Sequence, residues 1–287
     1  MKRIRYGLLA CILGAACSTE RPITARPLVR VAAAADLNVA LGELIARFTA
    51  EHAMDVSASY GSSGTFFAQL SNGAPFDVYL SADVEYPRRL VERGLALNDS
   101  AFTYAVGRIV LWAPASSRID VQSGGLRVLT AAAVRTISIA NPDHAPYGRA
   151  AVAALRNAGI YDEVKQRLVF GESVAQAMQF AQSGSADVGI VALSLALSPN
   201  ARDNGRWIEI DAALYPPIEQ GGAILTGAAN VDAARAFRAF MIGPQGRAIL
   251  LQHGFGVPES ASRRSAAGPG GPGGPGGPGG PGGPGGH

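Results

Sequence analysis

The chain has 287 residues, of which 48% are hydrophobic and 16% are charged. This balance is typical of a soluble globular protein and excludes an intrinsically disordered chain, while the length exceeds one compact core, so we expect two lobes. Three of the 25 basic residues and none of the 22 acidic ones precede Ser18, which leaves 22 of each sign in the rest of the chain. Because that part is formally neutral and has no Lys/Arg run, we expect no nucleic-acid partner.

The first 17 residues have the pattern of an export signal. Three basic side chains precede an apolar stretch at 6–16 that is too short to span a bilayer. The small residues before Cys17 are similar to a bacterial lipoprotein cleavage box, although Gly14 stands where such boxes prefer Leu, so lipid attachment at Cys17 and ordinary cleavage are both open. Cys11 lies inside the signal, which leaves the exported body without a cysteine for a disulfide or a thiolate metal site.

Apolar, β-rich segments alternate with helical patterns in the first part of the body. This alternation predicts an α/β architecture with buried, largely parallel strands. The predicted strands are 28–35, 55–60 and 77–82. Each is followed by a predicted helix, and Asp36 stands as the N-cap of the first one. The helices run through 37–48, 66–70 and 86–95.

A second series of strands and helices begins at 108. After it, a last strand and helix return the chain to the first lobe. The predicted strands of the second series are 108–114, 135–141, 167–170 and 187–193, with helices that begin at about Tyr147 and run through 174–181. A strand at 221–227, one helix at 231–250 and a closing segment at 253–258 complete the body. Two similar series with a return predict two lobes joined by two crossovers.

The predicted division of the chain follows from these series. The segments are a signal at 1–17, a tether at 18–27, lobe 1 at 28–107 plus 216–260, lobe 2 at 108–215 and a tail at 261–287. The tail contains six Pro-Gly-Gly repeats, whose residues have no side chains able to offset the backbone entropy of ordering, so we expect it to be disordered.

Gly61-Ser62-Ser63-Gly64 stands where a predicted strand gives way to a helix. In α/β sheets the strand ends and the helix N-termini meet at one edge, where unpaired N–H groups favour an anion. Two such edges facing each other make the cleft between the lobes a candidate anion site, to which the serine hydroxyls add donors. A plain capping turn is the alternative, since Ser is a favoured N-cap.

Several segments, in order and from about Val29 to Val257, resemble the periplasmic molybdate-binding proteins of bacterial ABC importers. They are VAAAADLNVALGELIARF, YGSSGTFFAQLSNGAPFDVYLSAD, ANPDHAPYGRAAVAAL, ESVAQAMQFAQSGSADVGIVALS and FMIGPQGRAILLQHGF. The resemblance implies a two-lobed periplasmic binding protein fold of type II, with the ligand in the interlobe cleft. It implies a monomer without enzymatic activity or cofactor, which captures molybdate or tungstate in the periplasm and delivers it to an ABC permease in the inner membrane.

The resemblance also implies which positions contact the oxyanion. A family serine at the first strand end is replaced here by Asp36, and the second family serine matches Ser63. A family tyrosine after the GIV strand is replaced by alanine. The implied ligand-binding set is Asp36, Ser62, Ser63, Tyr147, Val174 and Ala192.

Asp36 is the sharper departure from the family pattern. A carboxylate about 4 Å from a dianion is repelled by about 4 kcal/mol per unit of charge at an effective dielectric constant of about 20. Four readings are open. Asp36 caps its own helix and turns only its N–H toward the ligand, its carboxylate is protonated and donates, it coordinates Mo or W directly, or the ligand is another small anion or metal-oxo species.

Two further hypotheses involve side chains near the predicted site. Arg149 is placed to neutralise Asp36 or to meet the anion, with a solvent-facing helix position as the alternative. A secreted hydrolase is the competing class of function, with Ser63, His144 and either Asp36 or Asp83 as its triad. The chain contains no G-x-S-x-G motif, and His144 has no neighbouring histidine at metal-ligand spacing, so we expect no enzyme and a loop-capping or surface role for His144.

Overall fold

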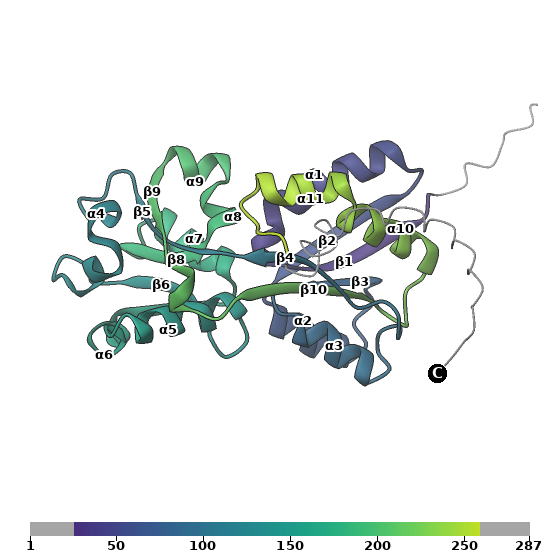
Figure 1. Cartoon of the computed structure of the whole chain (residues 1–287), viewed down its shortest axis with the longest axis horizontal. Helices are drawn as coiled ribbons and strands as arrows, with labels where there is room; N and C mark the ends of the chain where they lie inside the picture. Colours follow the sequence, from purple (N-terminus) through teal and green to yellow (C-terminus); the bar gives the residue numbers. More distant parts are fainter. Residues whose placement is uncertain (1–25, 259–287) are drawn as a thin grey trace, which may run out of the picture.

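The structure is a computed structural model, which describes residues 26–258. The predicted signal, lipid attachment at Cys17, the tail and most of the tether lie outside these residues. No helix within 26–258 is long and apolar enough to cross a membrane. Figure 1 shows two lobes side by side, each built around one five-stranded sheet with helices on its faces. The two-lobed α/β fold predicted from the sequence is confirmed.

The sheet of lobe 1 combines strands from both ends of the described chain. In spatial order they are β2 (Asp55–Gly61), β1 (Leu28–Ala34), β3 (Val78–Ser81), β10 (Ile218–Ile224) and β4 (Phe102–Gly107). β1 is parallel to β2 and β3, whereas β10 is antiparallel to β3 and β4.

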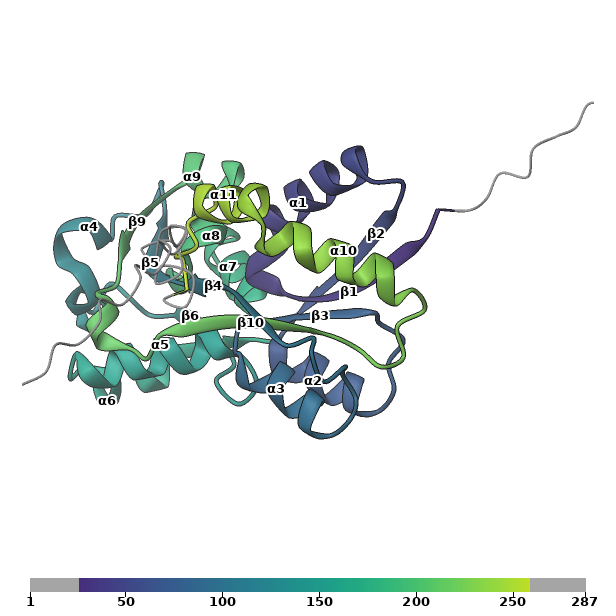
Figure 2. The ribbon, with the colours of Figure 1, turned by 45° about the vertical axis from the view of Figure 1, so that its right-hand side comes forward.

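Helices cover both faces of this sheet because successive residues of β1 point to opposite sides. Val29 and Val31 pack against α1 (Asn38–Glu51), α10 (Val231–Ile242) and α11 (Pro244–Gln252). Ala32 instead packs with residues of α2 (Ser63–Ser71) and α3 (Glu85–Glu92) on the other face. Figure 2 shows these two groups of helices on opposite sides of the sheet.

Lobe 2 has the same kind of sheet, with β6 at the centre of its parallel half. Its strands in spatial order are β7 (Leu168–Gly171), β6 (Ile137–Ala140), β8 (Val188–Ala192), β5 (Ile109–Pro114) and β9 (Gly205–Glu209). Its helices are α4 (Val121–Gly124), α5 (Pro146–Asn157), α6 (Tyr161–Val164), α7 (Val174–Gln182), α8 (Leu193–Ala196) and α9 (Pro199–Asp203). Four short 3-10 turns complete the described part of the chain, at η1 (Ala35–Leu37), η2 (Gly125–Thr130), η3 (Lys165–Arg167) and η4 (Ala212–Leu214).

The chain crosses between the lobes twice. β4 ends at Gly107 and β5 begins at Ile109, so one residue separates the two sheets. The return passes through Pro216 and Pro217 into β10. The closing segment then adds Gly256 to the edge of lobe 1 through two backbone hydrogen bonds with Val106, of 2.7 and 3.0 Å.

Three details of the predicted elements are wrong. Four of the eight strand pairings in the described residues are antiparallel, so the sheets are mixed rather than largely parallel. The helix predicted at 231–250 is two helices, because Gly243 is extended and Pro244 lacks the N–H needed to continue α10. Asp36 is not the N-cap of α1: that position is Leu37, and no side chain caps the helix.

Candidate ligand-binding site

A small cavity lies between the lobes at the point where several helical segments begin. Its volume is about 10 Å³, room for about one water molecule. The lining residues come from both lobes and belong mainly to the starts of η1, α2, α5 and α7. They are Ala34, Ala35, Asp36, Gly61, Ser62, Ser63, Ala82, Ala145, Pro146, Tyr147 and Val174. None of them is Lys or Arg.

The converging helix starts make this cavity a place of positive potential. The first N–H groups of a helix have no intrahelical acceptor, and the helix dipole is positive there. The starts of η1, α2 and α5 have no side-chain cap hydrogen bond, and only α7 is capped, by Ser173. Uncapped N–H groups at the edge of a cavity are suited to an anion that brings its own acceptors.

The two serines of the glycine-flanked motif have different hydrogen bonds. Ser63 Oγ accepts the N–H of Ala82 at 2.9 Å, which leaves its hydroxyl proton for an acceptor in the cavity. Ser62 Oγ instead donates to the carbonyl oxygen of His144 at 2.7 Å. Both residues are buried, with 1% and 6% of their surface exposed. Ser63 is therefore the hydroxyl donor that is ready for a ligand, while Ser62 joins the two lobes.

A buried triad of polar side chains, Asp36, Tyr147 and Gln220, adjoins the cavity. Tyr147 donates its hydroxyl proton to Asp36 Oδ2 at 2.8 Å, and Gln220 Nε2 is 2.5 Å from the same oxygen and 3.0 Å from the Tyr147 hydroxyl. The backbone carbonyl of Asp36 accepts the hydroxyl of Ser194 at 2.8 Å. Asp36 Oδ1 and Gln220 Oε1 are buried without a hydrogen-bond partner.

Burial controls the charge of Asp36. It raises the pKa of this carboxyl group to about 6, because the charged form loses its hydration. The hydrogen bonds from Gln220 and Tyr147, together with the nearby backbone N–H groups of Asp36 and Leu37, oppose this rise without cancelling it. Asp36 is thus a carboxyl group whose protonation changes in the range of neutral and mildly acidic pH.

Arg149 does not neutralise Asp36. Its guanidinium forms an ion pair with Asp83 of lobe 1, at 2.6 Å, and this pair links the lobes across a second hollow. That hollow has a volume of about 510 Å³ and is lined partly by Arg149, Asp83, Glu85 and Glu219. It carries more acidic than basic side chains, so it is less suited to an anion than the small cavity.

His144 connects the lobes through its backbone and its ring. Its carbonyl oxygen accepts the N–H of Gly64 at 2.9 Å as well as the Ser62 hydroxyl. Its Nδ1 is 2.9 Å from Ser62 Oγ, and its Nε2 is 3.4 Å from a carboxylate oxygen of Glu172. Because the His144 ring contacts Ser62, whose proton is directed to a carbonyl, rather than Ser63, the triad considered for a hydrolase is not assembled.

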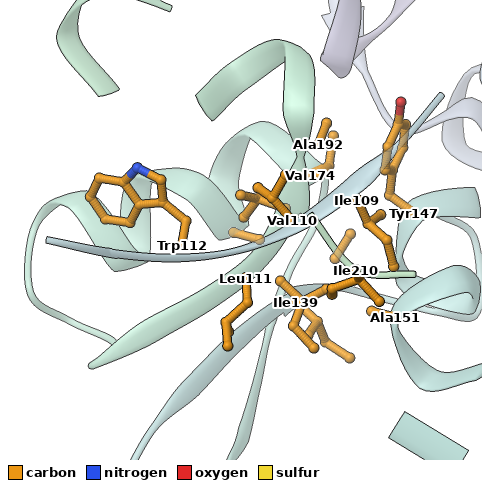
Figure 3. Close-up of a cluster of buried hydrophobic side chains, with 14 of the residues drawn as sticks. Ile109, Val110, Leu111, Trp112, Ile139, Tyr147, Ala151, Val174, Ala192 and Ile210 are labelled. Carbon is orange, nitrogen blue, oxygen red and sulfur yellow. The ribbon is translucent and has the colours of Figure 1, made fainter. Parts of the chain in front are cut away.

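The remaining predicted site residues lie in the core of lobe 2. Figure 3 shows Val174, Ala192 and Tyr147 among the buried hydrophobic side chains around β5, with the Tyr147 hydroxyl pointing away from that cluster. Val174 begins α7 and lines the cavity, so its N–H is well placed for a ligand. Ala192 ends β8, is fully buried and does not belong to the lining.

Reasoning from the sequence missed Gln220, because the predicted strand began one residue after it. The pairing of β10 with β4 shifts register between Gln220 and Gly221, a bulge of the kind that redirects side chains. Within 26–258 no group of three or more His, Cys, Asp or Glu residues is arranged to hold a metal ion.

The geometry matches a known family. The model of the bacterial extracellular solute-binding proteins matches residues 29–256. The chain belongs to this family. Against the molybdate-binding protein ModA of Azotobacter vinelandii it is 38% identical over 251 residues, which is 88% of this chain and 94% of the relative. Against ModA of Rhodobacter capsulatus it is 36% identical over 227 residues, 79% of this chain and 87% of the relative.

Solved structures of solute-binding proteins agree with this assignment. The periplasmic molybdate-binding protein of A. vinelandii aligns with a TM-score of 0.75 at 36% identity, covering 80% of this chain and 99% of that chain. The sulfate-binding protein SubI of Mycobacterium tuberculosis aligns with a TM-score of 0.69 at 18% identity, covering 84% and 91%, which shows a shared fold alone. The resemblance predicted from the sequence is confirmed.

Proposed function

We propose that this protein captures molybdate outside the cytoplasm and delivers it to an ABC permease. The observation that carries the proposal is the small interlobe cavity lined by helix starts, with the Ser63 hydroxyl proton directed to no protein acceptor and no Lys or Arg in the lining. The likeness to ModA proteins over most of both chains supports the choice of ligand. Molybdate is then a transported ligand and not a cofactor, and the protein is a carrier and not an enzyme.

Neutral donors suffice to hold such a dianion. A hydrogen bond to a charged group contributes about 1.5–3 kcal/mol, about twice a neutral one. The hydroxyl of Ser63 comes from lobe 1 and the N–H groups that begin α5 and α7 come from lobe 2. Because the cavity has room for about one water molecule, the lobes move apart to admit the anion, and their closure on it completes the set of donors. The anion then helps to hold the two lobes together, which gives the permease a closed shape to recognise.

Size separates molybdate from sulfate, because both carry two negative charges. Molybdenum–oxygen bonds are longer than sulfur–oxygen bonds, so donors fixed at the larger radius leave sulfate with stretched hydrogen bonds. Tungstate has nearly the size of molybdate, and we propose that the site accepts it as well. A site for a different small anion or metal-oxo species is the alternative, and the carboxyl group of Asp36 in the lining is the observation that favours it.

The proposed function also specifies the compartment in which the protein acts. Its relatives include the periplasmic protein of A. vinelandii and a putative ABC transporter substrate-binding lipoprotein of Bacillus subtilis, which is 28% identical over 257 residues. We propose that the chain acts in the periplasm as a monomer, without nucleic acid, and that Cys17 carries a lipid anchor. Mass measurement of the mature N-terminus tests the anchor.

Calorimetric titration of the purified protein with molybdate, tungstate, sulfate and phosphate tests the proposed function. We expect molybdate and tungstate to bind at least about 100-fold more tightly than sulfate, since poor geometry in two hydrogen bonds costs about 3 kcal/mol. Equal affinities for sulfate and molybdate would refute selection by size, and no binding of any oxyanion would refute the proposal.

Two matched serine variants locate the site within the same experiment. Ser63→Ala removes the hydroxyl whose proton is available, and we expect molybdate affinity to fall by about ten- to 100-fold. Ser62→Ala removes a hydroxyl whose proton is held by the His144 carbonyl, so its effect is smaller. Wild-type affinity in Ser63→Ala would place the ligand elsewhere.

A further inference from the structure

The Asp36 carboxyl group lines the proposed ligand cavity with one of its oxygens unpaired. Its Oδ2 accepts hydrogen bonds from Tyr147 and Gln220, while its Oδ1 is buried without a partner in a residue that lines the ligand cavity. A buried acceptor without a donor is costly, and it is more so when it carries charge. A dianion in the cavity would add two further negative charges beside it.

No positive side chain faces Asp36 from the elements packed around η1. Tyr147 of α5 and Gln220 of β10 contact the carboxylate, and Tyr104 of β4 is buried near it. α7 and α8 contain no titratable side chain. The charged residues of α1, β2, α5 and β10 are all exposed, namely Glu43, Arg47, Glu51, Asp55, Arg149, Arg156 and Glu219.

Two basic residues that form interlobe contacts, Arg149 and His144, are already engaged. Arg149 pairs with Asp83 at 2.6 Å, and the ring of His144 contacts Ser62 and Glu172. The cavity therefore offers no countercharge that would let a carboxylate and a dianion occupy it together. A proton on Asp36 removes the conflict, because it neutralises one charge and converts an unpaired acceptor into a donor.

We propose that Asp36 binds the oxyanion as a neutral carboxylic acid, whose Oδ1–H donates to a ligand oxygen, so that one proton enters the site with each dianion. This inference rests on the proposed function and specifies the donor set of the same site. The proton comes from solvent and stays on Oδ1, while Oδ2 keeps its hydrogen bonds from Tyr147 and Gln220. No bond to molybdenum is formed or broken.

The raised pKa of Asp36 agrees with this role. Burial brings it to about 6 in the protein, and a neighbouring dianion raises it further because it penalises the carboxylate. Only the protonated fraction of the free protein is competent to bind, so the apparent Kd rises about tenfold for each pH unit above about 6. The site also selects fully deprotonated oxyanions, since a protonated one would bring a donor to a position that already has one.

Calorimetric titration with molybdate in two buffers of different protonation enthalpy tests the proposal on the full protein. At pH about 8 we expect uptake of about one proton per molybdate, and between pH about 7 and about 9 a rise in Kd of about 100-fold. Asp36→Asn supplies an amide N–H₂ without titration. We expect it to bind with about zero proton uptake, a Kd independent of pH, and about 100-fold higher affinity than the wild type at pH about 8.

Asp162→Asn, at an exposed carboxylate on α6, is the matched control and should behave as the wild type. Any protonation of molybdate itself would appear equally in Asp36→Asn, so the difference between the variants isolates Asp36. Proton uptake by the wild type tests the protonation of Asp36 without any variant, even if Asp36→Asn does not fold.

The outcomes separate this proposal from the proposed function. Molybdate binding without proton uptake, weaker binding in Asp36→Asn at every pH, or a preference for protonated phosphate at pH about 8 would overturn the role of Asp36 while the carrier function stands. If neither the wild type nor Asp36→Asn binds molybdate, tungstate or sulfate at any pH, the proposed function is instead refuted.

Discussion

At the scale of single residues, Asp36 lines the proposed site, but burying its charged carboxylate lowers the stability of the fold. Its carboxyl group is almost fully buried and has hydrogen bonds on one oxygen only. Gly107 forms part of its support, because a Cβ there would lie 2.3 Å from the Tyr147 hydroxyl and 2.9 Å from Gln220 Nε2. The triad is thus closely fitted, although one of its members destabilises the ligand-free protein when charged.

This cost predicts how stability depends on pH. The folded-state pKa of Asp36 is about 6, above its ordinary value of about 3.9, so its contribution to stability is fully present below pH about 4 and lost as pH rises through about 6. The loss is on the order of 3 kcal/mol. We expect Asp36→Asn to melt at a higher temperature than the wild type at pH about 7, and the gap to disappear near pH about 4. Calorimetric melting of both ligand-free proteins across this range measures it, and a gap that does not change with pH would contradict it.

The candidate site was predicted partly from local signals and partly from the family resemblance. Ser62 and Ser63 were predicted from a glycine-flanked junction of a strand and a helix, whereas Tyr147 and Val174 were implied by the resemblance. The structure places Ser63, Tyr147 and Val174 at or next to helix starts. Gln220 could not be found in this way, because its side chain reaches Asp36 across 184 positions of sequence and its direction depends on a bulge. The pairing of Arg149 with Asp83 was unpredictable for the same reason, since it depends on how the lobes face each other.

At the scale of elements, hydrophobic periodicity predicted the longer helices and the buried strands. α1, α2, α5 and α7 follow the apolar spacing of the sequence, and β1, β3, β6 and β8 follow continuous apolar runs. β4 and β9 were not predicted, because both are edge strands whose short sequences mix polar and apolar residues. Their identity depends on the strands beside them rather than on their own sequence.

The start of α2 packs tightly against lobe 2. A Cβ on Gly64 would lie 2.6 Å from the carbonyl oxygen of His144 and 2.8 Å from its Cβ. Gly64→Ala must therefore push the lobes apart, and overpacking of this kind costs about 1–3 kcal/mol. We expect the affinity for molybdate to fall by about five- to 100-fold, measured by calorimetric titration, with little change in helix content.

Gly42→Ala is the matched control for this variant. Gly42 lies on α1, and a Cβ there would have no neighbouring heavy atom within 4 Å, so the substitution leaves the interlobe contact unchanged. Its molybdate affinity should equal that of the wild type. If Gly64→Ala also binds as the wild type does, the approach of α2 to His144 does not contribute to ligand binding.

At the scale of the whole molecule, the lobes meet around two hollows that differ in the charge of their lining side chains. The small cavity is formed by helix starts and neutral donors, and the hollow of about 510 Å³ beside it contains Arg149 together with acidic side chains. The core of lobe 2 continues into Ala34, Ala35 and Ala82 of lobe 1, so apolar contact also joins the lobes at the small cavity. The two crossovers allow these faces to separate and close as units.

The central claim is that the oxyanion is bound in the small cavity without a cationic side chain. A crystal structure of the protein with molybdate, in which the anomalous scattering of molybdenum locates the metal, tests it most directly. We expect molybdate oxygens within hydrogen-bonding distance of Ser63 Oγ and of the N–H groups of Tyr147 and Val174. Molybdenum located beside Arg149 in the larger hollow would contradict it.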